Sequence, residues 1–186
     1  MNQKIEIIPK NAKEYFYFQS LTSSTASGTF DCGISEYNDY IINDALCSMD
    51  DHIALTWLLI ERTTGKITAY MSLIMDAIKL SFSEKELHHL NYPFRTIPAM
   101  KIAKLAVDLS FSEKYKGIGS FMIDSAEHLA WGCNKDYCAC RFLTVDADLE
   151  HDEGVIVFYE KNGFIKNSEL YNKNRKTVSM RKDLYK

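Results

Sequence analysis

The pattern of apolar and polar positions predicts a chain that contains both strands and helices. Short apolar runs with turn residues at their ends are typical of buried strands. Such runs lie at residues 3–9, 53–61, 66–75, 99–107, 137–145 and 176–181. Thr63, Thr64 and Gly65 separate the second and third runs and are typical of a hairpin turn. The sequence therefore predicts a sheet that includes a hairpin within residues 53–75.

Other segments carry apolar residues at helical spacing, as Ile34, Tyr37, Ile41 and Ala45 do in the first of them. These helices are expected at residues 35–47, 117–131 and 154–162. Ser35 is suited to cap the first helix, Gly132 to end the second and Gly163 to end the third. Because helices alternate with strands in the second half of the chain, the sequence predicts an α/β fold with a mixed sheet.

Residues 76–97 show clearly neither the pattern of a strand nor that of a helix. A short amphipathic piece is followed by His88, His89 and prolines at positions 93 and 98. This segment is expected to form an excursion over a site. A chain of 186 residues has the length of one ordinary domain. We therefore expect residues 1–186 to form a single domain with an insertion at about residues 76–97.

Composition places the chain among globular proteins, with 46% hydrophobic and 25% charged residues. No apolar run has the length of a membrane span, and the first residues lack the apolar block of a signal peptide. The expected location is therefore the cytoplasm, with no membrane partner. Five cysteines, an odd number, argue against a disulfide framework, and no zinc-site spacing is present. We expect buried free thiols, with Cys138 and Cys140 on one face of a strand, and no metal.

The net charge of −3 is unevenly distributed along the chain. Residues 161–186 contain eight Lys and Arg against Glu169 and Asp183, an excess of six positive charges. The other 160 residues therefore carry −9. A basic segment of this kind is either a contact surface for an anion or a solvated edge.

Residues 101–125 contain a hydrophobic strand, a turn rich in lysine and glycine, and the start of the strongest helix. Gly117 and Gly119 let the main chain approach a ligand closely. Amide groups at a helix start bind phosphate oxygens, and Lys114 and Lys116 add positive charge. The P-loop pattern is absent, and the third glycine of a dinucleotide fingerprint is missing. The spacing alone leaves a phosphate site and a flexible helix start equally open.

A second cluster, Phe158-Tyr159-Glu160-Lys161-Asn162-Gly163-Phe164, follows a later strand. Its tyrosine is either a packed aromatic residue or a hydroxyl group presented to a cleft. Together the two segments resemble the GNAT superfamily of acyl-CoA-dependent N-acetyltransferases. Leu105-Ala106-Val107 followed by Lys114-x-x-Gly117-x-Gly119 resembles its pyrophosphate motif, and the second cluster resembles its FYExxGF signature. The resemblance covers roughly residues 30–184.

The first half is similar to one branch of this superfamily, the toxins of toxin–antitoxin modules. Phe30-Asp31-Cys32-Gly33 resembles the FxCG entry of that branch, and Ile97-Pro98-Ala99 fits it too. The spacer between Val107 and Gly117 is somewhat longer than in the family. Asp152 stands where the family often has asparagine, within an acidic stretch that either repels an anionic ligand or attracts a cationic acceptor.

The resemblance implies an α/β (α+β) fold whose mixed, mostly antiparallel sheet is splayed between the Leu105–Val107 strand and the next strand, with helices at its faces. It implies acetyl-CoA as cosubstrate and no metal. The residues implied in acetyl-CoA binding are Leu105, Ala106, Val107, Lys114, Tyr115, Lys116, Gly117, Ile118, Gly119 and Ser120. Tyr159 is the implied acid that protonates the departing CoA thiolate.

The general base stays open among Glu61, Asp76, His88 and His89. The resemblance implies acetyl transfer to a primary amine by direct attack in a ternary complex. The acceptor is a small amine or a peptide or protein amine, or alternatively the α-amine of aminoacyl-tRNA. A third hypothesis is a non-catalytic acyl-CoA-binding module. A homodimer is expected from the superfamily, and the toxin branch would add tRNA and an antitoxin as partners.

Overall fold

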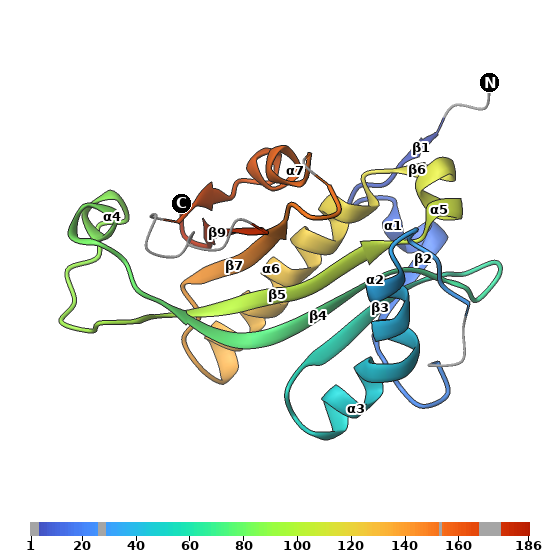
Figure 1. Cartoon of the computed structure of the whole chain (residues 1–186), viewed down its shortest axis with the longest axis horizontal. Helices are drawn as coiled ribbons and strands as arrows, with labels where there is room; N and C mark the ends of the chain where they lie inside the picture. The colour runs from blue at the N-terminus through green and yellow to red at the C-terminus, as the bar shows by residue number, and fades with distance from the viewer. Residues whose placement is uncertain (1–3, 26–28, 153, 168–175) are drawn as a thin grey trace. The chain divides into compact units, whose positions relative to one another are not determined.

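The computed structural model describes residues 4–25, 29–152, 154–167 and 176–186 (Figure 1). The strands are β1 (Ile5–Glu6), β2 (Phe16–Ser20), β3 (Leu55–Glu61), β4 (Ile67–Ile78), β5 (Ile97–Val107), β6 (Tyr115–Lys116), β7 (Phe142–Asp148), β8 (Ile165–Lys166) and β9 (Thr177–Asp183). The helices are α1 (Ala12–Tyr15), α2 (Ser35–Asp39), the π-helical η1 (Tyr40–Asp44), α3 (Ala45–Asp50), α4 (Phe82–Leu87), α5 (Leu109–Lys114), α6 (Ile118–Asp136) and α7 (Val155–Lys161). The chain forms two compact units: unit 1 comprises Met1–Ile74 and Ala103–Ser125, and unit 2 comprises Met75–Ile102 and Ala126–Lys186.

Seven strands form one sheet in the order β2-β3-β4-β5-β7-β9-β8, and β1 pairs with β6 separately. The pairs β2–β3, β3–β4, β7–β9 and β8–β9 are antiparallel, whereas β5 and β7 are parallel. The hairpin expected around Thr63–Gly65 is confirmed by the antiparallel register of β3 and β4. The prediction of a mixed, mostly antiparallel sheet with flanking helices is therefore confirmed.

The parallel pairing of β5 with β7 is short. It extends from Ala99 opposite Phe142 to Ile102 opposite Val145. Beyond these pairs β5 continues to Val107 and β7 to Asp148. Within the described ranges, the main chain of residues 105–107 therefore lies beyond the β7 ladder.

The core of unit 1 forms where the helical segment of residues 35–50 packs on the sheet. Ile41 and Ala45, two positions of its predicted apolar face, are buried with Leu58, Ile60 and Tyr70. The segment is a helix as predicted, but its middle turn is π-helical. The prediction that Ser35 caps it is wrong, because Ser35 is the first helical residue and Ile34 precedes it without a side-chain cap.

One junction in the second half of the chain differs from the prediction. α6 continues past Gly132 to Asp136, and β7 begins at Phe142 rather than at Tyr137. The reason is local, because the amide groups of Tyr137 and Cys138 both donate to the carbonyl of Cys133 and turn the chain back on the helix end.

All five cysteines are free thiols, as expected, but only Cys140 is fully buried. Cys32 and Cys133 are half-buried, whereas Cys47 and Cys138 are exposed. Because residues 137–141 form a loop, the prediction that Cys138 and Cys140 share one face of a strand is wrong. In the described ranges, no three His, Cys, Asp or Glu side chains are grouped so that they could hold a metal ion. No described helix has both the length and the apolar character needed to cross a membrane.

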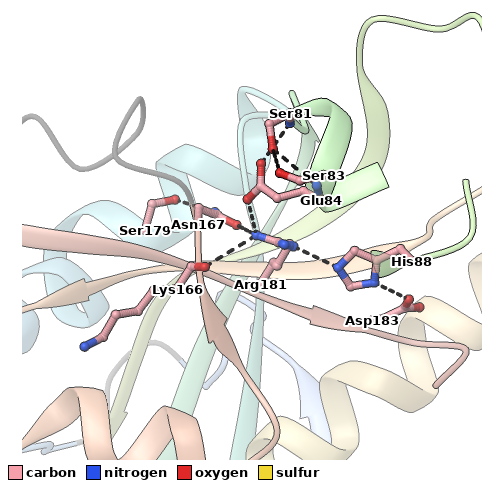
Figure 2. Close-up of polar contacts among 9 residues, drawn as sticks. All are labelled: Ser81, Ser83, Glu84, His88, Lys166, Asn167, Ser179, Arg181 and Asp183. Carbon is pink, nitrogen blue, oxygen red and sulfur yellow. Dashed lines mark hydrogen bonds and ion pairs between the residues drawn. The ribbon is translucent and has the colours of Figure 1, made fainter. Parts of the chain in front are cut away.

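Within residues 76–97, the segment expected as an excursion, residues 76–78 belong to β4 and residue 97 to β5. The residues between them, 79–96, contain α4 and join the two strands. A cluster of buried polar residues holds α4 to β9 (Figure 2). The side chain of Arg181 is only 1% exposed. Its Nη1 donates to Glu84 Oε1 at 2.8 Å and to Asn167 Oδ1 at 2.7 Å, and its Nε donates to His88 Nε2 at 3.2 Å. Whether residues 76–97 are an insertion into a single domain stays a prediction.

Both ends of α4 contribute to this cluster. At its start, Ser81 and Glu84 form a capping box, in which Glu84 also binds Arg181. At its end, His88 is 3% exposed and its Nδ1 lies 2.7 Å from Asp183 Oδ2. Since His88 Nε2 accepts from Arg181, the proton of a neutral ring is on Nδ1 and is donated to Asp183. Arg181 and Asp183, two positions apart on β9, thus hold α4 at both ends.

The ionisation of His88 should make the stability of the protein depend on pH. Burial is the main reason that the pKa of His88 lies below its ordinary 6.5, and the charge of Arg181 lowers it further, whereas the bond to Asp183 opposes the shift. The unfolded chain therefore binds this proton at a higher pH than the folded chain does. We expect the free energy of unfolding to fall as the pH is lowered from about 7.5 to 5, through the ordinary pKa of histidine.

Urea unfolding at a series of pH values would measure this change. The pKa of the His88 ring is affected directly by Arg181, Asp183 and Lys186. Glu84 binds Arg181, and Arg141 binds Asp183. The pKa of Asp183 lies below 3.8, because the bonds from Arg141, Tyr185 and His88 outweigh its burial, so Asp183 stays ionised throughout this window. The control is His88→Gln, whose side chain keeps a donor and an acceptor but does not titrate. An equally steep pH profile in the variant would contradict the assignment to His88.

Candidate functional site

The expected phosphate-binding segment begins where β5 ends. Asp108 follows Val107 and caps α5, accepting from the amide of Ser110 at 2.9 Å and from the amide of Asp31 at 2.9 Å. The unusually long spacer between Val107 and Gly117 is therefore a short helix followed by β6. The Asp31 carboxylate in turn accepts from Gly33 and Asn38, which connects the Phe30–Gly33 segment to this junction.

Gly117 is the residue at which this segment enters α6. It has φ = +89°, and a Cβ atom there would lie 2.7 Å from the main-chain oxygen of Ile7. The close approach arises because β1 pairs with β6, and the amide of Ile7 donates to the carbonyl of Lys116 at 2.6 Å. Only glycine combines this left-handed backbone with the missing Cβ atom.

The first turn of α6 has the properties of an anion site. The amide of Phe121 donates to the carbonyl of Gly117 at 2.9 Å, which is the first helical bond. The amides of residues 118–120 precede that bond and lie at the positive end of a helix of 19 residues. Ile118 is buried and anchors the turn, whereas Gly119 and Ser120 are half-buried. Main-chain groups in this turn can therefore bind phosphate oxygens.

The two lysines of the segment differ in their surroundings. Lys114 Nζ lies 2.7 Å from Oε1 of Glu61, a carboxylate that is 2% exposed. This bond, with a smaller effect of Tyr115, raises the pKa of Lys114 to about 12. Lys116 is exposed and lies 4.0 Å from Glu6. The positive charge of Lys114 is thus balanced by Glu61, which weakens its attraction for an anion.

Tyr115 belongs to the core of unit 1. Its hydroxyl group donates to Glu61 at 2.9 Å, and its ring packs edge-on against Phe16 at 5.0 Å. Thr64 also donates to Glu61 at 2.8 Å. These three donors outweigh burial and hold the pKa of Glu61 below its ordinary value. Tyr115 can therefore serve a ligand only through its main chain, and Glu61 was not foreseen as the partner of Lys114.

Tyr159, the expected acid, lies on α7 in unit 2 and is 5% exposed. Its ring is 5.1 Å from that of Phe158 and 5.3 Å from that of Phe164, both edge-on. Gly163, at φ = +84°, ends the helix and lets the amide of Phe164 donate to the carbonyl of Tyr159 at 3.0 Å. The whole signature therefore fixes the orientation of the Tyr159 ring.

The residues considered as a general base are in different environments. Glu61 and His88 are buried and bound to cationic partners, as described above. Asp76 accepts from the hydroxyl of Thr144 at 2.6 Å, whereas His89 is exposed and has φ = +54°. No proton acceptor is therefore singled out among the described residues.

Local partners balance much of the acidic stretch and of the basic C-terminal segment. In the acidic stretch, Asp146 is bound to Lys101 and Asp148 to His151. Glu150 is bound to Lys176, one of the C-terminal lysines. Arg181 is buried, and Lys182 is bound to Glu127. Four charged residues of these two segments lie outside the described ranges, namely Glu153, Glu169, Lys173 and Arg175.

No protein-family model matches the chain, and no curated protein does. Solved structures do match. A mutant of KacT has a TM-score of 0.75 at 18% identity, over 91% of this chain and 95% of that one. AtaTR bound with AcCoA has a TM-score of 0.69 at 19% identity, over 90% and 93% of the two chains. AtaT complexed with acetyl-methionyl-tRNAfMet has a TM-score of 0.70 at 19% identity, over 88% and 93%.

At this level of identity the comparisons concern the fold, and they agree with the resemblance seen in the sequence. The chain covers nearly the full length of each compared protein. The mixed, mostly antiparallel sheet, the short β5–β7 pairing and the glycine entry into α6 are the features that the resemblance implied. The chain therefore has the fold of KacT and of the AtaT toxin, in agreement with the fold that the sequence resemblance implied.

Proposed function

We propose that the protein is an N-acetyltransferase that transfers an acetyl group from acetyl-CoA to a primary amine by direct attack in a ternary complex. The observation that carries this proposal is the start of α6, which Gly117 precedes with a left-handed backbone. This start follows β5, whose last residues lie beyond the pairs that join β5 to β7. Such a strand offers main-chain groups to the pantetheine amides, and the helix start offers amides to the pyrophosphate. The fold shared with AtaTR bound with AcCoA supports the same ligand.

In this proposal the chain contributes binding, charge stabilisation and a proton. Residues 105–107 bind the pantetheine, and a main-chain N–H there stabilises the oxyanion that forms when the amine attacks the thioester carbon. Lys114, Tyr115, Lys116, Gly117, Ile118, Gly119 and Ser120 are the residues proposed to surround the pyrophosphate. Lys114 and Tyr115 act through their main chain, because their side chains bind Glu61.

Tyr159 is the proposed general acid, which donates its proton to the CoA thiolate as the carbon–sulfur bond breaks. Its ring is held by edge-on contacts with Phe158 and Phe164, which fix the orientation of the ring that carries the hydroxyl group. Tyrosine-to-phenylalanine mutants of KacT and AtaT are among the compared structures, which supports a role for a tyrosine. No metal takes part in the proposed chemistry.

The α-amine of aminoacyl-tRNA is the second candidate acceptor, after small amines and peptide or protein amines. The structure of AtaT with acetyl-methionyl-tRNAfMet favours it. An α-amine also loses its proton near neutral pH more readily than a lysine does, which suits a site without a singled-out base. Against it, most of the described basic groups near the C-terminus are already paired. We also propose that the protein forms a homodimer, that it has an antitoxin as a partner and that it is located in the cytoplasm.

Acetyl-CoA turnover measured by thiol release, with polyamines, peptides and charged tRNA as acceptors, tests this function. We expect acetyl-CoA to bind and at least one amine to release the thiol. Because tRNA binding displaces counterions, its acetylation should fall steeply with added salt, whereas acetylation of an uncharged small amine should not. Absence of acetyl-CoA binding would overturn the proposal. Tight binding without turnover of any acceptor would favour the non-catalytic module.

A further inference from the structure

Two cysteines meet at the end of α6. Cys133 lies in the last turn of the helix, and Cys138 lies two residues beyond its final residue. Their Sγ atoms are 3.2 Å apart. A disulfide requires about 2.0 Å, so the sulfurs must approach by only about 1 Å to form a bond. The pair is also accessible, because Cys138 is exposed and Cys133 is half-buried.

The main chain holds this pair together. The amides of Tyr137 and Cys138 both donate to the carbonyl of Cys133 at 2.9 Å, which folds Cys138 back over the helix end. Asn134 fixes the following residues, because its side chain accepts from the amide of Cys140 and donates to the carbonyl of Cys140, each at 2.6 Å. The sulfurs therefore meet because the loop of residues 137–140 is anchored on both sides of Cys138.

We propose that Cys133 and Cys138 form a reversible redox modification site, which low-molecular-weight disulfides convert to an intramolecular disulfide. In the first step, one thiolate of the pair attacks glutathione disulfide, forms a mixed disulfide and releases one glutathione thiolate. In the second step, the other thiol loses its proton to water and displaces the second glutathione. The two cysteines lose two electrons and two protons, and one glutathione disulfide becomes two glutathione molecules.

The surroundings explain why the pair would be a modification site rather than a permanent crosslink. The bond would close a loop of only a few residues, which removes little entropy from the unfolded chain. It would therefore stabilise the fold only slightly and remain easy to reduce. The other three cysteines lack this arrangement. Cys32 is half-buried and its thiol donates to Asn38 Oδ1, Cys47 is exposed without a described thiol beside it, and Cys140 is 2% exposed.

The experiment is incubation of the reduced full-length protein with glutathione disulfide, followed by mass spectrometry of the intact chain and thiol counting. We expect the mass to fall by about 2 Da and the reactive thiols of the unfolded protein to fall from five to three. Peptide mapping should place the new bond between Cys133 and Cys138. Reductant should restore five thiols. Any glutathione adduct on the pair should be short-lived, because the second thiol displaces it.

Three variants make the result specific. In Cys133→Ser and in Cys138→Ser the remaining thiol of the pair should keep a stable glutathione adduct of about 305 Da. The matched control is Cys47→Ser, which removes an exposed thiol elsewhere and should leave the loss of about 2 Da unchanged. Stable adducts on both thiols of the wild-type pair would overturn the proposal, as would a disulfide that persists in Cys133→Ser.

Discussion

Replacing Tyr159 by phenylalanine is expected to lower kcat for acetyl transfer by roughly two to four orders of magnitude. The variant loses the hydroxyl group that is proposed to protonate the departing thiolate, and it keeps the ring that packs between Phe158 and Phe164. Affinity for acetyl-CoA should therefore change little. Thiol release measures the first quantity and calorimetric titration with acetyl-CoA measures the second.

The matched control is Tyr137→Phe, which removes a hydroxyl group from a side chain that is 88% exposed. It should turn over acetyl-CoA at the wild-type rate. If Tyr159→Phe retains the wild-type kcat with a responsive acceptor, another group protonates the thiolate. If it loses acetyl-CoA binding as well, the role of Tyr159 is structural.

The second large effect is expected at Arg181. Replacement by methionine fills a similar volume but leaves Glu84 without its buried cationic partner and removes the donor to His88. Removing one member of a buried ion pair usually lowers the free energy of unfolding by about 3–5 kcal/mol. We expect a loss of this size in urea unfolding of Arg181→Met, monitored by circular dichroism.

Lys182→Met is the matched control, because Lys182 is the next residue of β9 and its partner Glu127 is also only partly exposed. This pair is reached by solvent, so its loss should lower the free energy of unfolding by less than about 1 kcal/mol. Arg181→Lys should fall between the two, since an ammonium group cannot serve His88, Glu84 and Asn167 in the planar arrangement of a guanidinium. An Arg181→Met variant no less stable than Lys182→Met would show that the cluster is not a major source of stability.

The sequence predicted the elements whose pattern is local. The apolar face of the helix at residues 35–50 was visible at Ile41 and Ala45, and both are buried. The hairpin around Thr63–Gly65 and the helix that Gly117 precedes were recognised from turn residues and spacing. Element limits were less secure, as at Gly132, where glycine does not end α6 because the chain turns only after Asp136.

Contacts between distant residues could not be predicted in the same way. Lys114 was expected to add charge to a phosphate site, but its partner Glu61 lies 53 residues earlier at the end of a strand. His88 was considered only as a base, because nothing near it in the sequence shows that Arg181 and Asp183 enclose it. The strand β2, of five residues, and the helix α5, of six, were also missed, since elements this short carry little periodic signal.

The cluster that joins α4 to β9 sets an order of events during synthesis. Arg181 is made 97 residues after Glu84, and Asp183 is made 95 residues after His88. While the ribosome is still producing the chain between them, α4 has neither of the side chains that hold it, and β7 lacks the strand that pairs with it along its whole length. Unit 2 therefore completes its fold only after β9 has left the ribosome, and nascent chains shorter than this should leave residues 79–96 open to proteases.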